Sequence, residues 1–220
     1  MDIFQANEIL NYWFPKDGKP DYNKWFIKSK DYDNEIKRKF GKLLKEAEKG
    51  KGYGWLVNKD SYVAYIILMD QFSRHIYRGK GDSFKNDKGV MIFTEMGFDL
   101  YKDDLKGYEF MFAFMPYMHT ENLKYQKKGK CIFEAHKNLY GNNSSYKRQI
   151  NKKKICNNNN LTQNDKEFKM LQDMENHVNG HLQTIKIFGR FPKRNKALNR
   201  ISSPEEIKYM ENPEVQKRPY

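Results

Sequence analysis

The chain has 220 residues, 38% of them apolar and 15% aromatic, so it is long enough and hydrophobic enough to fold around a sizeable core. Its two cysteines, Cys131 and Cys156, do not have metal-ligand spacing, which excludes a disulfide scaffold and a CxxC zinc site. The longest apolar run, residues 63–69, is far shorter than the roughly 18 residues of a membrane span. The N-terminus lacks the regions of a signal peptide. We therefore expect a cytoplasmic protein that does not partner a membrane.

The net charge is +13, from 41 Lys and Arg against 28 Asp and Glu, a balance typical of proteins that bind polyanions. However, there are 33 lysines and 8 arginines, and asparagine is also abundant. An AT-rich genome produces this joint enrichment, so we do not expect nucleic acid as the partner. Arginine clusters where lysine cannot replace its planar fork of donors, at Arg74, Arg78, Arg190, Arg194 and Arg200.

Apolar residues recur with helical spacing along most of the chain. In residues 2–14, Ile9 and Trp13 share the apolar face, and Pro15 ends the pattern. Residues 61–77 begin apolar on nearly all sides, which predicts a central, buried helix. Further helices are expected at residues 31–49, 83–101, 105–114, 120–140 and 166–188.

The C-terminal part carries clear helix boundaries. Gly189 is expected to close the preceding helix, and SSPEE at 202–206 predicts the start of another. Residues 141–165 are polar, with a basic run and an asparagine tract, and predict a low-complexity, flexible insertion. No segment alternates with a period of two, so we predict an all-α fold, with residues 1–220 forming one domain.

The first candidate motif is DQFSRHIYR, residues 70–78. On a helix, Asp70, Arg74 and Arg78 would share one stripe, with Gln71 beside it. The stripe emerges from the most hydrophobic helix, and buried charges require partners. Two interpretations stay open: an Asp70–Arg74 ion pair that stabilises the helix, or the floor of a cavity for a small anion.

The second motif is FMPYMHTENLKYQ, residues 114–126. Pro116 is predicted to break one helix, and Thr120 with Glu121 to begin the next as cap and first-turn acid. His119, next to a carboxylate, is then a candidate acid–base or ligand-orienting group. A purely structural role is the alternative.

The third motif is HLQTIKIFGRFPKRNKALNR, residues 181–200, which contains no acidic residue. A turn there carries Arg190, Arg194 and Asn195. Such a loop either folds its arginines onto carboxylates elsewhere, with Asp70 as the first candidate, or presents them to an anionic ligand.

Cofactor signatures are absent from the sequence: it contains no GxGxxG, no P-loop and no GxSxG. His177 and His181 are four residues apart, as in some zinc sites, but no glutamate stands between them. We therefore expect neither a metal nor a cofactor.

Taken together, DQFSRHIYRG, MPYMHTENLKYQ and FGRFPKRN resemble a helical family, the bacterial domain-of-unknown-function family 924, and the similarity spans the chain except the insertion at 141–165. The resemblance implies a tetratricopeptide-like superhelical array of antiparallel helix pairs, and no activity. The family's polar signature falls on Asp70, Gln71, Arg74, Arg78, Asp87, His119, Glu121, Gln126, His181, Arg190, Arg194 and Asn195. The chain departs from the family pattern at Ser73, His75, Thr120 and Lys193.

Four functions remain open from these patterns. The leading hypothesis is a pocket where the three motifs converge on a small anionic ligand, with the arginines as anion contacts and His119, Glu121 and His181 as catalytic candidates if the protein is an enzyme. The alternatives are a scaffold that binds proteins or acidic peptides, a polyanion binder, and a purely structural polar network. The YWF and WF aromatics near the N-terminus are candidates for pairing subunits into an oligomer.

Overall fold

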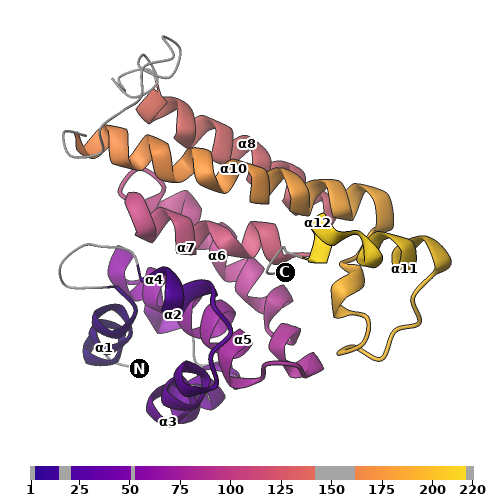
Figure 1. The fold of residues 1–220 in the computed structure, drawn as a ribbon. Helices are drawn as coiled ribbons and strands as arrows, with labels where there is room; N and C mark the ends of the chain where they lie inside the picture. The colour runs from indigo at the N-terminus through magenta and orange to yellow at the C-terminus, as the bar shows by residue number, and fades with distance from the viewer. Residues whose placement is uncertain (1–2, 15–20, 51–52, 142–161, 217–220) are drawn as a thin grey trace. The chain divides into compact units, whose positions relative to one another are not determined.

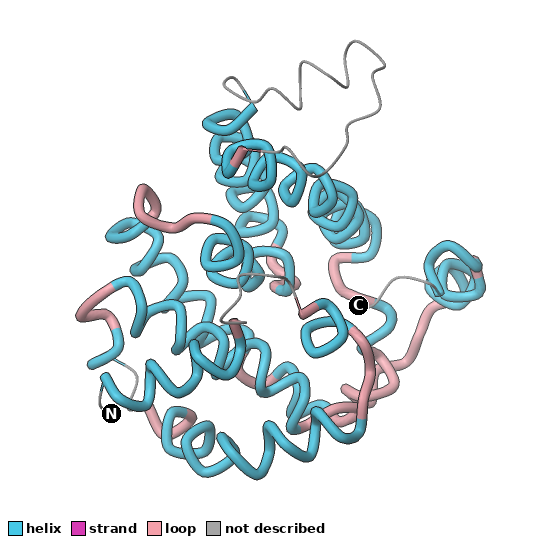
Figure 2. Tube along the Cα trace, turned by 60° about the vertical axis from the view of Figure 1, so that its left-hand side comes forward, coloured by secondary structure: helices cyan, strands magenta, loops and turns pink. Residues whose placement is uncertain are grey.

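The computed structural model describes residues 3–14, 21–50, 53–141 and 162–216, and these ranges contain helices and loops but no strand (Figures 1 and 2). The all-α prediction is confirmed. In the described part of the chain, no helix is long and apolar enough to span a membrane. The chain divides into two compact units, unit 1 with residues 1–116 and 191–220, and unit 2 with residues 117–190. The single domain expected for residues 1–220 stays a prediction.

Unit 1 holds most of the helices. They are α1 (Ile3–Trp13), α2 (Tyr22–Phe26), α3 (Lys30–Ala47), α4 (Lys59–Ile66), α5 (Ser73–Ile76), α6 (Asp87–Tyr101), most of α7 (Gly107–His119), α11 (Pro204–Glu211) and α12 (Pro213–Gln216). Short 3₁₀ turns lie at Tyr53–Trp55, Gly81–Phe84 and Pro192–Arg194.

An aromatic core organises unit 1. The Trp13 ring packs edge-on against Phe72 and Phe112, with centroids 5.3 and 5.4 Å away. Trp25 packs on the same Phe112 ring and donates from Nε1 to the carbonyl of Trp13 over 3.0 Å. Trp13 and Trp25 are buried and do not present a surface for pairing subunits, whereas Phe26 of the WF segment is 40% exposed, so pairing through that segment stays a prediction. The large apolar surfaces of the two tryptophans stabilise the fold instead.

The central helix expected at residues 61–77 is confirmed, but it is not α-helical throughout. α4 continues into a π-helical segment, Ile67–Phe72, and then into α5. Every residue of the π-helical segment is buried. Asp70 and Gln71, the first polar residues of the DQFSRHIYR motif, therefore lie on the part of the helix whose geometry is irregular, a feature often found at functional sites.

Unit 2 is built around α8 (Leu123–Gly141) and α10 (Gln163–Phe188), which lie side by side (Figure 1). Gly129 of α8 packs closely against Tyr117 of α7, because a Cβ at position 129 would lie 2.6 Å from the Cβ of Tyr117. Gly189 closes α10 in the left-handed conformation, with φ of 67°, as the sequence predicts.

Residues 142–161 lie outside the described residues, so a flexible insertion over that range stays a prediction. The predicted C-terminal boundary of the insertion, residue 165, lies inside a helix. Thr162 caps α10 and forms a reciprocal capping box with Asp165, so these residues belong to the helix.

Two expectations for the second motif are wrong. Pro116 does not end its helix, because α7 continues through it to His119. Thr120 and Glu121 do not begin the next helix; the side chain of Asn122 accepts from the backbone N–H groups of Lys124 and Tyr125 at the start of α8. His119 is consequently the last residue of a helix rather than the residue before a cap.

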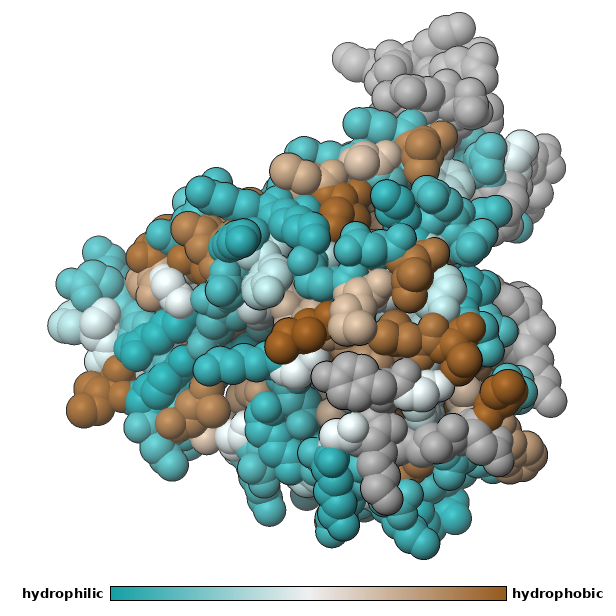
Figure 3. Space-filling view, turned by 180° about the vertical axis from the view of Figure 1, so that it is seen from behind, coloured by the Kyte–Doolittle hydropathy of each residue, from teal (hydrophilic) through white to brown (hydrophobic). Residues whose placement is uncertain are grey.

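On one face of the molecule, apolar residues are exposed among hydrophilic ones (Figure 3). Scattered exposed apolar residues are ordinary, whereas a row of them on one helix indicates a contact surface.

Candidate functional site

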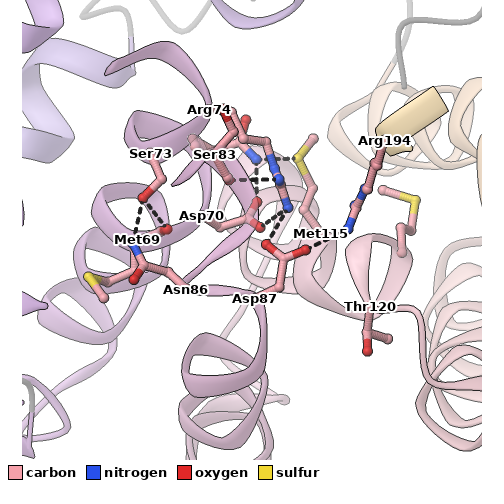
Figure 4. Close-up of polar contacts among 12 residues, drawn as sticks. Met69, Asp70, Ser73, Arg74, Ser83, Asn86, Asp87, Met115, Thr120 and Arg194 are labelled. Carbon is pink, nitrogen blue, oxygen red and sulfur yellow. Dashed lines mark hydrogen bonds and ion pairs between the residues drawn. The ribbon is translucent and has the colours of Figure 1, made fainter. Parts of the chain in front are cut away.

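Four charged side chains of unit 1 form an alternating chain of ion pairs, which we call the Arg–Asp cluster: Asp70, Arg74, Asp87 and Arg194 (Figure 4). Arg74 Nη2 donates to Asp70 Oδ1 over 2.9 Å and to Asp87 Oδ1 over 3.0 Å. Arg194 Nη1 donates to the other oxygen of Asp87, Oδ2, over 2.8 Å. Asp87 therefore bridges the guanidinium groups of two motifs that lie far apart in the sequence.

The buried end of the cluster is held from several sides. The carboxylate of Asp70 is fully buried, and its Oδ2 accepts from Gln71 Nε2 over 2.6 Å. The same amide nitrogen lies 3.1 Å from Met115 Sδ. Arg74 Nη1 donates to the carbonyl of Ser83 over 3.3 Å. Buried charges are stable when they are paired and hydrogen-bonded in this way.

Both guanidinium groups also lie over aromatic rings. Arg194 is 4.4 Å from the Phe84 centroid and 4.6 Å from that of Phe191, and Arg74 is 5.6 Å from the Phe84 centroid. Each contact is of the cation–π type. Phe84 thus contacts both of the guanidinium groups that Asp87 bridges.

The protonation state of Arg74 is well defined. Burial alone would lower its pKa, but the neighbouring carboxylates of Asp70 and Asp87 outweigh that effect, and the pKa is raised. The guanidinium is therefore always charged. Its Nε is buried and has no hydrogen-bond partner in the structure, which is uncommon for a buried donor on a charged group.

Arg78, expected on the same stripe as Arg74, belongs to a different cluster. Its Nε and Nη2 donate to both oxygens of Asp33 on α3, over 2.6 and 2.8 Å. His75 Nδ1 lies 2.8 Å from Asp33 Oδ1. A carboxylate oxygen at this distance requires a proton on Nδ1, so we assign His75 as the Nδ1–H tautomer donating to Asp33.

The titration of this second cluster follows from its contacts. Burial lowers the pKa of His75, despite the hydrogen bond to Asp33. Burial alone would raise the pKa of Asp33, but hydrogen bonds from Arg78 and His75 outweigh it and lower the pKa. At neutral pH the cluster therefore consists of a neutral imidazole, a carboxylate and a guanidinium.

Asn195 shapes the loop that carries Arg194. Its Nδ2 donates to Ser202 Oγ and to Glu206 Oε2, each over 3.0 Å, and its Oδ1 accepts from Arg200 Nε over 2.9 Å. Arg200 also donates to the carbonyl of Phe191 over 3.1 Å. Asn195 is buried, and its contacts are those of a residue that fixes a loop.

Unit 2 contains the remaining motif residues. The rings of His119 and His181 lie 6.2 Å apart. His181 Nδ1 lies 2.7 Å from the carbonyl oxygen of His177, so Nδ1 carries a proton and donates it to that carbonyl. Gln126 Nε2 donates to the carbonyls of Met118 and Thr120, over 2.7 and 2.9 Å, and so holds the turn that follows α7.

Glu121 and Arg190 are the other motif residues of unit 2, and both are half-buried. Within the ranges that the structure describes, no group of three or more His, Cys, Asp or Glu side chains is placed to hold a metal ion.

The twelve signature residues thus belong to several separate networks of contacts. In unit 1 the structure joins Asp70, Gln71 and Arg74 with Asp87 and Arg194, and places Arg78 and Asn195 in other networks. The Asp70–Arg74 pair is confirmed. The third motif does place an arginine on a carboxylate, because Arg194 pairs with Asp87; a contact of that motif with Asp70 stays a prediction. Sequence reasoning missed Asp33, which lies in the first turn of α3, where acidic residues are common because they stabilise the helix N-terminus.

A family model described as "Bacterial protein of unknown function (DUF924)" matches residues 9–214. The chain belongs to this family. It is similar to a solved structure of a protein of unknown function from Agrobacterium tumefaciens, with 23% sequence identity and a TM-score of 0.69, covering 95% of this chain and 98% of that chain. At this identity the likeness shows the fold alone. No curated protein matches the sequence.

Proposed function

We propose that this protein binds a small anion, a phosphate or a carboxylate, at the Arg–Asp cluster of unit 1. The observation that carries the proposal is the buried Nε of Arg74, which has no hydrogen-bond partner although it belongs to a charged group. A buried donor without a partner costs free energy unless an ion or a water molecule satisfies it. An anion oxygen would use this donor and add a charge-assisted hydrogen bond.

The surroundings supply guanidinium N–H donors, which form charge-assisted hydrogen bonds with phosphate and carboxylate oxygens. Two guanidinium groups, Arg74 and Arg194, share the single carboxylate of Asp87. Because Asp70 and Asp87 already balance the charges of Arg74 and Arg194, an anion would be held by hydrogen bonds more than by net Coulomb attraction. We therefore expect a modest affinity, with a Kd of about 0.1–1 mM for inorganic phosphate or succinate.

The remaining motif residues enter this proposal only as predictions. His119, Glu121 and His181 stay the candidates for proton transfer, and Gln126 and Arg190 stay candidate ligand contacts, all in unit 2. Arg78 and Asn195 are left out of the proposed site, since Arg78 pairs with Asp33 and Asn195 bonds to the loop around Arg200. The tetratricopeptide-like superhelix and the cytoplasmic location also stay predictions.

Titration calorimetry with inorganic phosphate and with succinate tests the proposal. Arg74→Lys keeps a positive charge beside Asp70 and Asp87 but removes Nε and the planar fork. We expect it to weaken binding by at least about tenfold. Arg78→Lys is the matched control, because it makes the same change one helical turn away, outside the Arg–Asp cluster, and we expect binding to stay at the wild-type level.

Two results would contradict the proposal: no heat of binding with either anion in the wild-type protein, or equal binding by wild type and Arg74→Lys. Circular dichroism of each variant at the titration temperature checks that it is folded. Absence of binding by a folded wild-type protein would favour the alternative of a scaffold that binds proteins or acidic peptides.

A further inference from the structure

The Nε atom of Arg74, on which the proposed anion site depends, is closed off in this structure. The side chain of Arg74 as a whole is 19% exposed, but Nε itself is buried, so no water-sized space adjoins it. The carboxylate of Asp70, which pairs with the same guanidinium, is fully buried as well. Because phosphate and carboxylate ions are larger than a water molecule, an anion reaches Nε only if a neighbouring part of the protein moves.

The segment of residues 81–87, which lies against Arg74, is fixed to the body of unit 1. Asn86 Nδ2 donates to Ser73 Oγ over 2.8 Å and to Glu48 Oε1 over 3.1 Å. These hydrogen bonds join the segment to α5 and to the residue that follows the last turn of α3. The segment is therefore an anchored wall of the site.

The C-terminal loop, residues 191–200, packs on this wall. Arg194 Nη1 donates to Asp87 Oδ2 over 2.8 Å (Figure 4). The carbonyl oxygen of Ala197 approaches the backbone of Gly81 so closely that a Cβ at position 81 would lie 2.8 Å from it. The loop is thus the element, distant in the sequence, that closes on the segment beside Arg74.

Hydrogen bonds within the C-terminal loop hold it as one body. Asn195 accepts from Arg200, and Arg200 also donates to the carbonyl of Phe191. The backbone of Asn199 has a φ of 52°, in the left-handed region, where a residue other than glycine is uncommon and is often found at ligand clamps and switches. The loop can therefore move as a unit and keep its own hydrogen bonds when its contacts with the wall open.

We propose that the C-terminal loop is a lid on the Arg–Asp cluster, which opens to admit the anion and closes over it with Arg194 against Asp87. The inference rests on the proposed function and names the way in which the ligand enters that site. Because the lid carries Arg194, its guanidinium lies beside the site only in the closed form. An anion that uses these donors binds the closed form more tightly and shifts the population towards it.

The exchange of the Arg74 Nε proton with water measures how often the lid opens. In NMR spectra its signal is assigned from its absence in Arg74→Lys, and the Nε proton of Arg38, an exposed residue of α3, is the internal reference. We expect the Arg74 proton to exchange at least about tenfold more slowly than that of Arg38, because only the open form exposes it. Inorganic phosphate should slow the exchange further.

Gly81→Ala opens the lid without changing a charged residue. Its methyl group does not fit 2.8 Å from a backbone oxygen, so the C-terminal loop must shift away. We expect the exchange of the Arg74 Nε proton to accelerate by at least about tenfold. Gly89→Ala is the matched control: it adds the same methyl group on α6, where no atom lies within 4 Å of the new Cβ, and should leave the exchange rate unchanged.

Arg194→Gln removes the ion pair between the lid and Asp87 without adding volume, and it should accelerate the exchange as well. Circular dichroism checks that each variant is folded. The lid would be overturned if the Arg74 proton of the wild-type protein exchanged as fast as that of Arg38, or if neither Gly81→Ala nor Arg194→Gln accelerated its exchange. Faster exchange in both variants with no effect of phosphate would retain the lid and contradict the proposed anion site.

Discussion

Arg194 Nη1 donates to Asp87 Oδ2 over 2.8 Å, although the two residues are 107 positions apart in the sequence. This contact ties the C-terminal loop of unit 1 to the first turn of α6. Since Asp87 also accepts from Arg74, it is the residue on which the first and third motifs meet.

Replacing Asp87 should destabilise unit 1 strongly. Asp87→Asn leaves the guanidinium groups of Arg74 and Arg194 without their shared carboxylate in a largely buried place, and we expect a loss of about 3 kcal/mol in the free energy of unfolding. Urea denaturation measures it. Asp82→Asn is the control, because Asp82 is exposed and a change within about 0.5 kcal/mol is expected there. Equal effects of the two substitutions would show that the bridge does not stabilise the fold.

Two glycines of α6 should respond to alanine in opposite ways. A Cβ at Gly97 would lie within 2.5 Å of three ring atoms of Tyr62, which is fully buried and cannot move aside easily. Gly97→Ala should therefore cost about 2–3 kcal/mol through overpacking. Gly89 has no atom within 4 Å of such a Cβ, and Gly89→Ala should stabilise the helix by about 0.5–1 kcal/mol. Thermal unfolding of both variants checks the contrast; a Gly97→Ala protein as stable as wild type would contradict the close packing.

His75 should make stability depend on pH. Its folded-state pKa is lowered by burial, so below the unfolded-state pKa of about 6.5 the unfolded chain binds a proton that the folded protein does not. The free energy of unfolding is therefore undiminished by His75 above that pH, and it decreases as the pH falls towards the folded-state pKa of His75. His75→Asn removes this term, so the drop in unfolding free energy between pH 7 and pH 5 should be smaller in the variant.

Urea denaturation at several pH values provides the measurement. The other histidines are common to both proteins, so the difference between the two curves isolates His75. A steeper drop in the variant than in wild type would give the wrong sign and would refute the neutral, buried imidazole.

Asn195 should matter to the loop rather than to a ligand directly. Asn195→Ala leaves Glu206 and the Arg200 guanidinium without an amide partner, and we expect a loss of about 2 kcal/mol in unfolding free energy. Lys196→Ala, at the next and exposed position, should be nearly neutral. Comparable losses at both positions would contradict the role assigned to the amide.

The sequence predicts the helices of this fold well because each one depends on local patterns. Apolar periodicity indicates a central buried helix over residues 61–77, and glycine after the apolar run marks the end of α10 at Gly189. The prediction that a helix ends at Pro116 is wrong. Proline usually ends a helix, but α7 continues past Pro116, and the adjacent Met115 and Tyr117 are buried. The π-helical geometry around Asp70 has no comparable local signal.

The partners of the charged residues were harder to predict from sequence. The Asp70–Arg74 pair follows from helical spacing, since the two residues are one turn apart. Arg194 pairs with Asp87, and Arg78 pairs with Asp33. In each pair the two residues lie on elements that only the tertiary structure brings together. Composition could indicate that arginine is needed in these segments, but not which carboxylate each guanidinium meets.

The most direct test of the central claim, an anion held by Arg74, is native mass spectrometry of the purified wild-type protein and of Arg74→Lys after incubation with inorganic phosphate and succinate. We predict an excess mass equal to one anion on wild type, lost on denaturation and absent from the folded Arg74→Lys protein. A wild-type mass equal to that of the chain alone under all conditions, or the same excess mass on both proteins, would contradict the claim.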